Sequence, residues 1–387
     1  MRSRERTRGL LRAPRLTWDI MFRGRYSFTY DRMPMHASRM SMAKRLNLLK
    51  AGANLVYRRV NPWSMPLHVQ IELTNYCTLR CPVCPTGTKA ANRPPRAMDV
   101  ALFERVMDEL GPFLLTASLW AWGEPLLHPR LEEILHAAGE HDVVTLLSTN
   151  GQSLNNDRVV ETLIQAPPTY LIVAIDGLTD ETNSRYRVGS TLAPILDGVR
   201  KLAGMKRQRG LRLPVLTMRY IVMKHNQHEV PQLDEFARRN GFDLLTIRNV
   251  FFVESSSDGE LRERLTPDPN VWSECGYGHG GNLRQGSFVC QEPFWFPTVF
   301  ADGTLVLCEQ DYNAQLALGQ ISEDVSFADL WYCRRATQLR KIIRDDMESV
   351  SFCRKCPYMD RPITDFNVEA HYLMPDPDAR SATSGRS

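Results

Sequence analysis

The sequence of 387 residues has no long apolar run. No stretch reaches the roughly 18 apolar residues that a membrane-spanning helix needs, and the first residues lack the apolar core of a secretory signal. Hydrophobic residues make up 43% and charged residues 24%, which excludes a wholly disordered chain. We therefore expect a cytoplasmic globular protein of two or three domains.

The sequence also has little net charge, only +4, but that charge is unevenly placed. Residues 1–50 carry a net +10, so the rest of the chain carries −6. A nucleic-acid enzyme normally carries its basic residues on its folded domains, which argues against a nucleic-acid partner. We expect residues 1–43 to form a disordered basic arm, and such an arm could also touch an anionic surface.

The rest of the sequence alternates between two hydrophobic periodicities. Runs typical of strands occur at 67–73, 115–121, 143–148, 170–175, 215–222 and 244–250. Runs of helical periodicity lie between them, at 100–110, 130–139, 155–165, 192–208 and 229–240. This alternation predicts an α/β fold with a parallel sheet, in which ligands bind beyond the carboxyl ends of the strands.

Composition divides the chain further. We expect a lead-in helix within 44–64, the βα units over 65–255, and a linker or active-site cover over 256–287. Residues 288–366 contain the hairpin signal ADGT and should form a small α+β domain. The polar tail over 367–387 is expected to be disordered.

Three cysteines follow the first predicted strand, within NYCTLRCPVCP. Cys77, Cys81 and Cys84 have the spacing C-x3-C-x2-C. Three thiolates on one short loop can ligate three irons of a [4Fe–4S] cluster and leave the fourth iron open to a small molecule. A structural zinc ion normally takes four ligands, so a triplet suits zinc poorly.

Two polar motifs, WGEP at 122–125 and STNG at 148–151, end the next two predicted strands. Together with CTLRCPVC and the βα rhythm, these motifs resemble the radical S-adenosylmethionine (radical SAM) superfamily over residues 65–255. The resemblance implies a partial (β/α)6 TIM-like barrel. It also implies that the open iron binds S-adenosylmethionine, whose reductive cleavage yields a 5′-deoxyadenosyl radical that abstracts a substrate hydrogen.

The resemblance assigns several side chains to the nucleotide. Gly123 and Glu124 look like the end of the family's Gly-Gly-Glu motif, in which Trp122 replaces the first glycine. Ser148 and Asn150 could reach the ribose hydroxyls or the carboxylate, or could cap a helix instead.

Three further residues are candidates for the same cofactor site. Val83 lies in the cysteine loop, where the family places an apolar residue near the adenine. Asp176 follows the fourth predicted strand and could face cofactor or substrate. Arg187 is a candidate clamp for a carboxylate or a polar substrate, and a plain surface arginine is the alternative.

A second group of cysteines lies in the C-terminal part: Cys290, Cys308, Cys353 and Cys356. Four thiolates can complete either a structural zinc site or an iron–sulfur cluster. Their arrangement around a hairpin, a helix and a closing C-x2-C resembles the SPASM or twitch modules of radical SAM enzymes. That resemblance implies one auxiliary [4Fe–4S] cluster, and hence two clusters in the chain.

Two cysteines remain, Cys275 and Cys333. Cys275 falls in the predicted cover segment, where it is a candidate hydrogen donor. An inert thiol is the alternative for both residues.

An auxiliary cluster with four thiolates has no open iron, so its useful capacity is to accept or donate one electron. Combined with hydrogen abstraction, this predicts two-electron oxidation of a small polar substrate such as a carbohydrate or cyclitol. The cysteine spacing also resembles that of the radical SAM dehydrogenases of aminocyclitols. Alternatives are peptide maturation, sugar epimerisation, and a non-catalytic iron–sulfur or zinc scaffold. Reductive cleavage requires an external one-electron donor such as flavodoxin or ferredoxin.

Overall fold

The computed structural model describes residues 14–30, 32–57, 59–256, 259–268, 290–354, 356 and 367–373. Its centre is a run of parallel strands at the predicted positions. These are β3 (His68–Ile71), β4 (Thr116–Ser118), β5 (Val144–Thr149), β6 (Tyr170–Ala174), β7 (Val215–Val222) and β8 (Leu244–Asn249).

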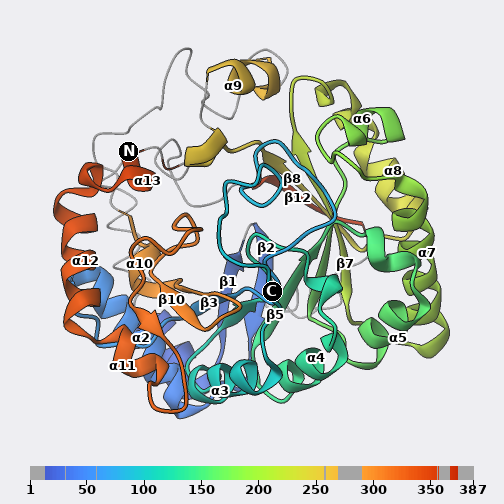
Figure 1. The fold of residues 1–387 in the computed structure, drawn as a ribbon. Helices are drawn as coiled ribbons and strands as arrows, with labels where there is room; N and C mark the ends of the chain where they lie inside the picture. Colours follow the sequence, from blue (N-terminus) through green and yellow to red (C-terminus); the bar gives the residue numbers. More distant parts are fainter. Residues whose placement is uncertain are drawn as a thin grey trace.

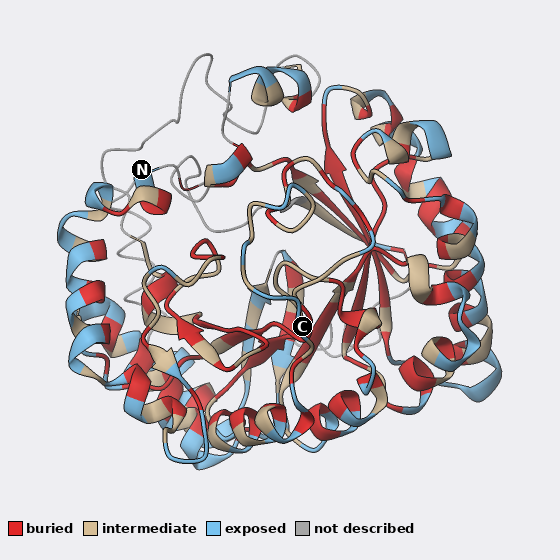
Figure 2. Ribbon diagram, in the orientation of Figure 1, coloured by how far each residue is buried: buried red, intermediate tan, exposed pale blue. Residues whose placement is uncertain are grey.

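Helices follow these strands and lie along their outer side (Figure 1). They are α3 (Val100–Leu110), α4 (Leu131–Gly139), α5 (Asp157–Gln165), α6 (Asp180–Ser184), α7 (Leu192–Arg209) and α8 (Leu233–Asn240). The buried positions of the strands and helices face one another (Figure 2), as expected for βα units packed around one core.

The C-terminal part extends this sheet at both edges. β9 (Thr298–Val299) pairs in parallel with β3, and β10 (Thr304–Val306) and β11 (Gly319–Gln320) continue from it. At the other edge, β12 (Asn367–Tyr372) pairs antiparallel with β8. Ten of the described strands thus form one open sheet, which confirms the predicted α/β fold with an unclosed barrel.

The expectation of a disordered arm over 1–43 is wrong for part of that segment. β1 (Tyr26–Tyr30) and β2 (Met33–Ala37) form an antiparallel hairpin, and α2 (Met42–Tyr57) follows it. Met33 and Met35 are buried against Leu146, Ile172 and other residues of the parallel strands. The open barrel supplies the apolar surface that holds the hairpin, and local composition does not reveal this long-range packing.

Two other segments also contain more structure than expected. Residues Asn367–Tyr372 form β12 because the exposed edge of β8 offers backbone partners. The predicted cover segment contains α9 (Gly259–Leu265). The remainder of that segment from residue 269 onward, including Cys275, lies outside the described residues.

The C-terminal part packs on the barrel through a shared hydrophobic core. Its helices are α10 (Glu292–Trp295), α11 (Phe327–Trp331), α12 (Arg334–Asp345) and α13 (Ser351–Arg354). Phe327 and Trp331 belong to the same buried cluster as Phe103 of α3. The Glu109 carboxylate accepts the backbone N–H groups of Phe327 (2.8 Å) and Ala328 (2.7 Å). Within the described residues, no helix has the length and apolarity of a membrane span.

Candidate functional site

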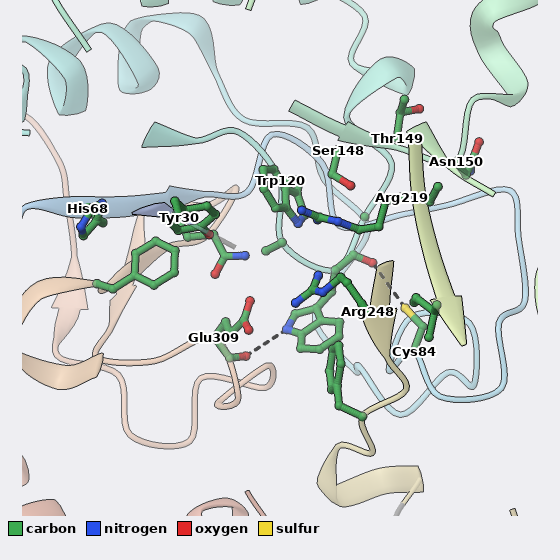
Figure 3. Close-up of a pocket in the computed structure, with 18 of the residues that line it drawn as sticks. Tyr30, His68, Cys84, Trp120, Ser148, Thr149, Asn150, Arg219, Arg248 and Glu309 are labelled. Carbon is green, nitrogen blue, oxygen red and sulfur yellow. Dashed lines mark hydrogen bonds between the residues drawn. The ribbon is translucent and has the colours of Figure 1, made fainter. Parts of the chain in front are cut away.

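The loop after β3 holds Cys77, Cys81 and Cys84 at the edge of a cavity of about 420 Å³. The Cys77 sulfur accepts hydrogen bonds from the Leu79 backbone N–H and from Asn150 Nδ2, each at 3.4 Å. The Cys84 thiol lies 3.9 Å from the Trp122 carbonyl oxygen, to which it donates (Figure 3). The structure therefore brings the cysteine loop together with both polar motifs.

Burial raises the pKa of all three loop thiols, that of Cys81 to about 11. A thiol in such surroundings stays protonated unless a cation stabilises the thiolate. Iron provides that stabilisation when it is bound by the sulfur. The donor set therefore fits a cluster held by three protein ligands.

Gly123 and Glu124 tie the WGEP segment to the residues that precede the cysteine loop. A Cβ at Gly123 would lie 2.0 Å from the Thr74 carbonyl oxygen, so only glycine fits this approach. The Glu124 N–H donates to the Tyr76 carbonyl (2.9 Å), and Thr74 Oγ1 donates to the Glu124 carbonyl (2.8 Å).

The Glu124 side chain is buried and connects the WGEP and STNG segments. Its carboxylate accepts hydrogen bonds from Thr149 Oγ1 (2.6 Å), the Asn150 N–H (2.7 Å) and the Leu126 N–H (3.1 Å). Burial raises its pKa, and these three donors oppose the shift. Glu124 thus positions both segments at the wall of the cavity.

STNG is not the cap of the following long helix, because Asn156 caps α5. Ser148, Thr149 and Asn150 line the cavity, and Gly151 adopts a left-handed conformation with φ 75°. Asn150 Oδ1 accepts the Gln152 N–H (2.9 Å), which makes a tight polar turn. Asn150 thus lines the cavity and also accepts the N–H of Gln152, where the short helix η2 (Gln152–Asn155) begins, so the two roles expected for this segment are compatible at this residue.

Arg187 lines the cavity beside Cys81, whereas Asp176 lies behind it. Arg187 Nε and Asp176 Oδ2 form an ion pair of 2.5 Å, and Asp176 Oδ1 accepts the Ile221 N–H (2.7 Å). Contrary to the expectation that Asp176 faces cofactor or substrate, its side chain is fully buried and holds Arg187. Val83 is buried and lines the cavity, in an apolar cluster with Tyr186 and Ile221.

The cavity continues past these residues to side chains that sequence reasoning did not identify. Tyr30, His68, Trp120, Arg219 and Arg248 all line it (Figure 3). One signal could have identified the arginines. Each is the one charged residue of a largely buried strand, VLTMRYIV or LLTIRN, and a buried charge is typical of a functional site.

The four C-terminal cysteines line a second, apolar cavity, with Leu307, Leu339, Ile343 and Phe352 among the other lining residues. Burial raises the pKa of Cys353 to about 12 and those of Cys290 and Cys308 well above the ordinary value. Among the described residues, no group of three or more Cys, His, Asp or Glu side chains is arranged to hold a single metal ion. The four thiols thus face one apolar cavity.

Cys333 is not part of this second set. Its sulfur accepts the Ala336 N–H (3.2 Å) at the start of α12, so it serves as a helix cap.

Trp122 connects the two cysteine regions. Its indole Nε1 donates to the Glu309 carbonyl (2.9 Å), and its ring meets Tyr312 edge to face. Glu309 directly follows Cys308, while the Trp122 carbonyl contacts Cys84. The residue that replaces the expected glycine thus lies between the two sites.

Comparisons with known proteins agree with this arrangement. The model of the radical SAM superfamily matches residues 71–237, and that of the SPASM iron–sulfur cluster-binding domain matches residues 290–357. A cofactor-modifying protein of tungsten-containing aldehyde ferredoxin oxidoreductase from Pyrococcus furiosus is 24% identical over 47% of this chain and 51% of its own length. PqqA peptide cyclase of Granulibacter bethesdensis is 25% identical over 48% of this chain and 47% of its own.

These matches span about half the length of the relatives. Among solved structures, Streptococcus suis SuiB bound to its precursor peptide SuiA has a TM-score of 0.56 at 18% identity. That alignment covers 82% of this chain and 74% of SuiB, and it shows a shared fold.

Proposed function

Because the chain belongs to the radical SAM superfamily and carries a SPASM domain, we propose that it cleaves S-adenosylmethionine reductively and oxidises a small polar, carbohydrate-like substrate by two electrons. Its cofactors are [4Fe–4S] clusters and S-adenosylmethionine. Two clusters are proposed, one on each set of cysteines.

One observation carries this proposal. The loop with three thiols opens onto the same cavity as Gly123, Glu124 and Asn150, whereas the other four thiols enclose a separate cavity. When bound, the first cluster with the nucleotide supplies a hydrogen-abstracting radical, and the second supplies an electron acceptor. Trp122 lines the first cavity and is hydrogen-bonded to Glu309, the neighbour of Cys308, so this contact links the two sets of thiols.

The chain's own residues bind and orient the reactants. We assign Cys77, Cys81 and Cys84 as ligands of the first cluster. Arg187, fixed by Asp176, offers a guanidinium to the nucleotide's carboxylate. Gly123 leaves backbone carbonyls close to the loop, where the nucleotide's ammonium group needs acceptors.

Three further residues complete the proposed nucleotide site. Asn150, held by its backbone bond to Glu124, and Ser148 provide hydrogen-bonding groups for the ribose. Val83 contributes an apolar surface for the adenine.

We assign Cys290, Cys308, Cys353 and Cys356 as ligands of the auxiliary cluster. Their apolar cavity excludes water, which suits electron transfer better than ligand binding. An external flavodoxin or ferredoxin is proposed as the one-electron donor.

Peptide maturation is the second candidate function. It is favoured by the names of the matched proteins, a peptide cyclase and SuiB with its precursor peptide. In that case a peptide side chain, rather than a free small molecule, would enter the cavity.

The test is anaerobic reconstitution followed by iron and sulfide analysis and by reduction with dithionite. We expect about eight irons per chain and release of 5′-deoxyadenosine. Deuterated sugars, cyclitols and peptides should then identify the substrate by transferring deuterium into 5′-deoxyadenosine. Bound zinc without nucleotide cleavage would instead support a scaffold.

A further inference from the structure

One end of the large cavity lies away from the proposed nucleotide site. In Figure 3, Tyr30 and His68 lie at this end and Cys84 at the other. Tyr30 comes from the N-terminal hairpin, and His68 is the first residue of β3. The end of the cavity is thus built by the hairpin that the sequence did not predict.

Aromatic rings from β1 and from the C-terminal end of α10 surround His68. Ring centroids lie 5.8 Å away for Phe28, 6.1 Å for Tyr30, 6.5 Å for Trp295 and 6.0 Å for Phe296. Tyr30 and Phe296 also meet edge to face at 5.9 Å. All five residues line the cavity. A wall of this kind binds the faces and edges of ring-shaped groups.

His68 places one polar position in this wall. Its Nδ1 lies 2.6 Å from Thr116 Oγ1, and Thr116 is its one hydrogen-bond partner within the described part of the chain. Its second ring nitrogen, Nε2, has no hydrogen-bond partner within the described residues, and the ring lines the cavity.

The protonation state of His68 restricts what it can bind. Burial lowers the pKa of His68 to about 4, so the imidazole is neutral at pH 7. Nε2 accepts a hydrogen bond when Nδ1 donates to Thr116, and donates one when Thr116 donates to Nδ1. A hydroxyl group can donate to or accept from Nε2, so it can bind either tautomer. A carboxylate can only accept and an ammonium group can only donate, so each can bind only one tautomer.

We propose that this end of the cavity is a substrate subsite for a hydroxyl-bearing ring, with the hydroxyl on His68 Nε2 and the ring against Tyr30 and Phe296. The inference rests on the proposed function, because it names the part of the substrate that the cavity holds. A cyclitol or sugar and the phenol ring of a tyrosine side chain share this chemistry. The subsite is thus the position at which the small-molecule and peptide candidates can be separated.

The test compares probes that differ by one hydroxyl. Binding of p-cresol, toluene and myo-inositol to the full chain is measured by titration calorimetry. We expect p-cresol or myo-inositol to bind measurably tighter than toluene. Preference for p-cresol assigns a phenolic substrate, and preference for myo-inositol a cyclitol-like one. Equal affinity for p-cresol and toluene, with no binding of myo-inositol, would overturn the proposal.

Variants then locate the contact. His68→Phe keeps a ring but removes the hydrogen bond, and we expect it to weaken the hydroxylated probe about 3- to 10-fold while toluene is unaffected. His36→Phe is the matched control, because His36 lies in β2, on the hairpin that carries Tyr30, with an exposed side chain outside the cavity. An equal loss in both variants would contradict the subsite.

A measurement on the unmodified protein tests the subsite even if the His68→Phe variant fails to fold. In NMR spectra of protein labelled with 15N-histidine, the hydroxylated probe should shift the ring signals of one histidine. Those signals should be missing from the spectrum of His68→Gln, and toluene should shift no histidine signal. A probe that shifts no histidine overturns the proposal. Neither readout involves nucleotide cleavage, so failure of the proposed reaction would appear separately, as absence of 5′-deoxyadenosine.

Discussion

The two cysteine regions differ in number of thiols, surroundings and connection to the rest of the chain. Cys77, Cys81 and Cys84 come from one loop beside a cavity that also contains polar motifs and arginines. The C-terminal four come from separate elements and enclose a small apolar cavity. Three thiols beside a polar cavity suit the proposed cluster with one position open to a ligand, and four thiols around an apolar cavity suit the proposed cluster that is complete without one.

The largest expected effect is the loss of nucleotide cleavage when a cysteine of the three-thiol loop is replaced. Cys81→Ala removes one of the three proposed iron ligands, so we expect 5′-deoxyadenosine formation to fall by at least about 1,000-fold and iron to fall from about eight to about four per chain. Iron analysis and chromatography of reaction products measure both. Retained cleavage would show that this loop does not hold the reactive cluster.

Replacing one of the four C-terminal cysteines by alanine should affect substrate oxidation more than nucleotide cleavage. Cys308→Ala should also lower iron to about four per chain, yet leave nucleotide cleavage within about 10-fold while abolishing substrate oxidation. Cys333→Ala is the control, because Cys333 caps α12 outside both sets. If Cys308→Ala stops cleavage as completely as Cys81→Ala, the proposed division of roles is wrong.

A smaller effect concerns the scaffold of the three-thiol loop. Glu124→Ala leaves the donors of Thr149 and Asn150 without their buried acceptor, so we expect a loss of about 3 kcal/mol in the free energy of unfolding. Urea denaturation of the cofactor-free protein measures it. Glu133→Ala removes a carboxylate from an exposed ion pair with Arg130 and should leave the free energy of unfolding nearly unchanged.

The smallest effect should appear at the contact between the regions. Trp122→Phe removes the indole bond to Glu309, worth about 1 kcal/mol, and should speed amide hydrogen exchange around Glu309 and Tyr312 several-fold. Trp331→Phe loses a similar bond, to the Ser64 carbonyl (3.0 Å), away from this contact. Equal exchange in the two variants would mean that Trp122 does not couple the regions.

The sequence was sufficient for features that depend on local pattern. The six parallel strands follow from hydrophobic runs, and the loop cysteines and their neighbouring motifs follow from spacing and position at the strand ends. Features that depend on distant partners were missed. Met33 and Met35 make a buried hairpin only because the inner faces of β5 and β6 receive them, and β12 forms only because β8 has a free edge.

The roles of the side chains that line the cavity also depend on distant partners, so the sequence predicted them only in part. Asp176 and Arg187 were both identified, but only the fold shows that Asp176 serves Arg187 rather than a ligand. His68 begins an ordinary buried strand, and nothing nearby in the sequence marks it as part of an aromatic wall.

The core that joins α3 to α11 has a consequence for the whole enzyme. Phe103 and Trp331 are buried in one cluster, and Glu109 fastens the start of α11. If either the βα units or the C-terminal part unfolded alone, the apolar surface of the other would be exposed. Heating should therefore give a single cooperative unfolding transition. A protein built this way should keep or lose the structure of both cysteine regions together.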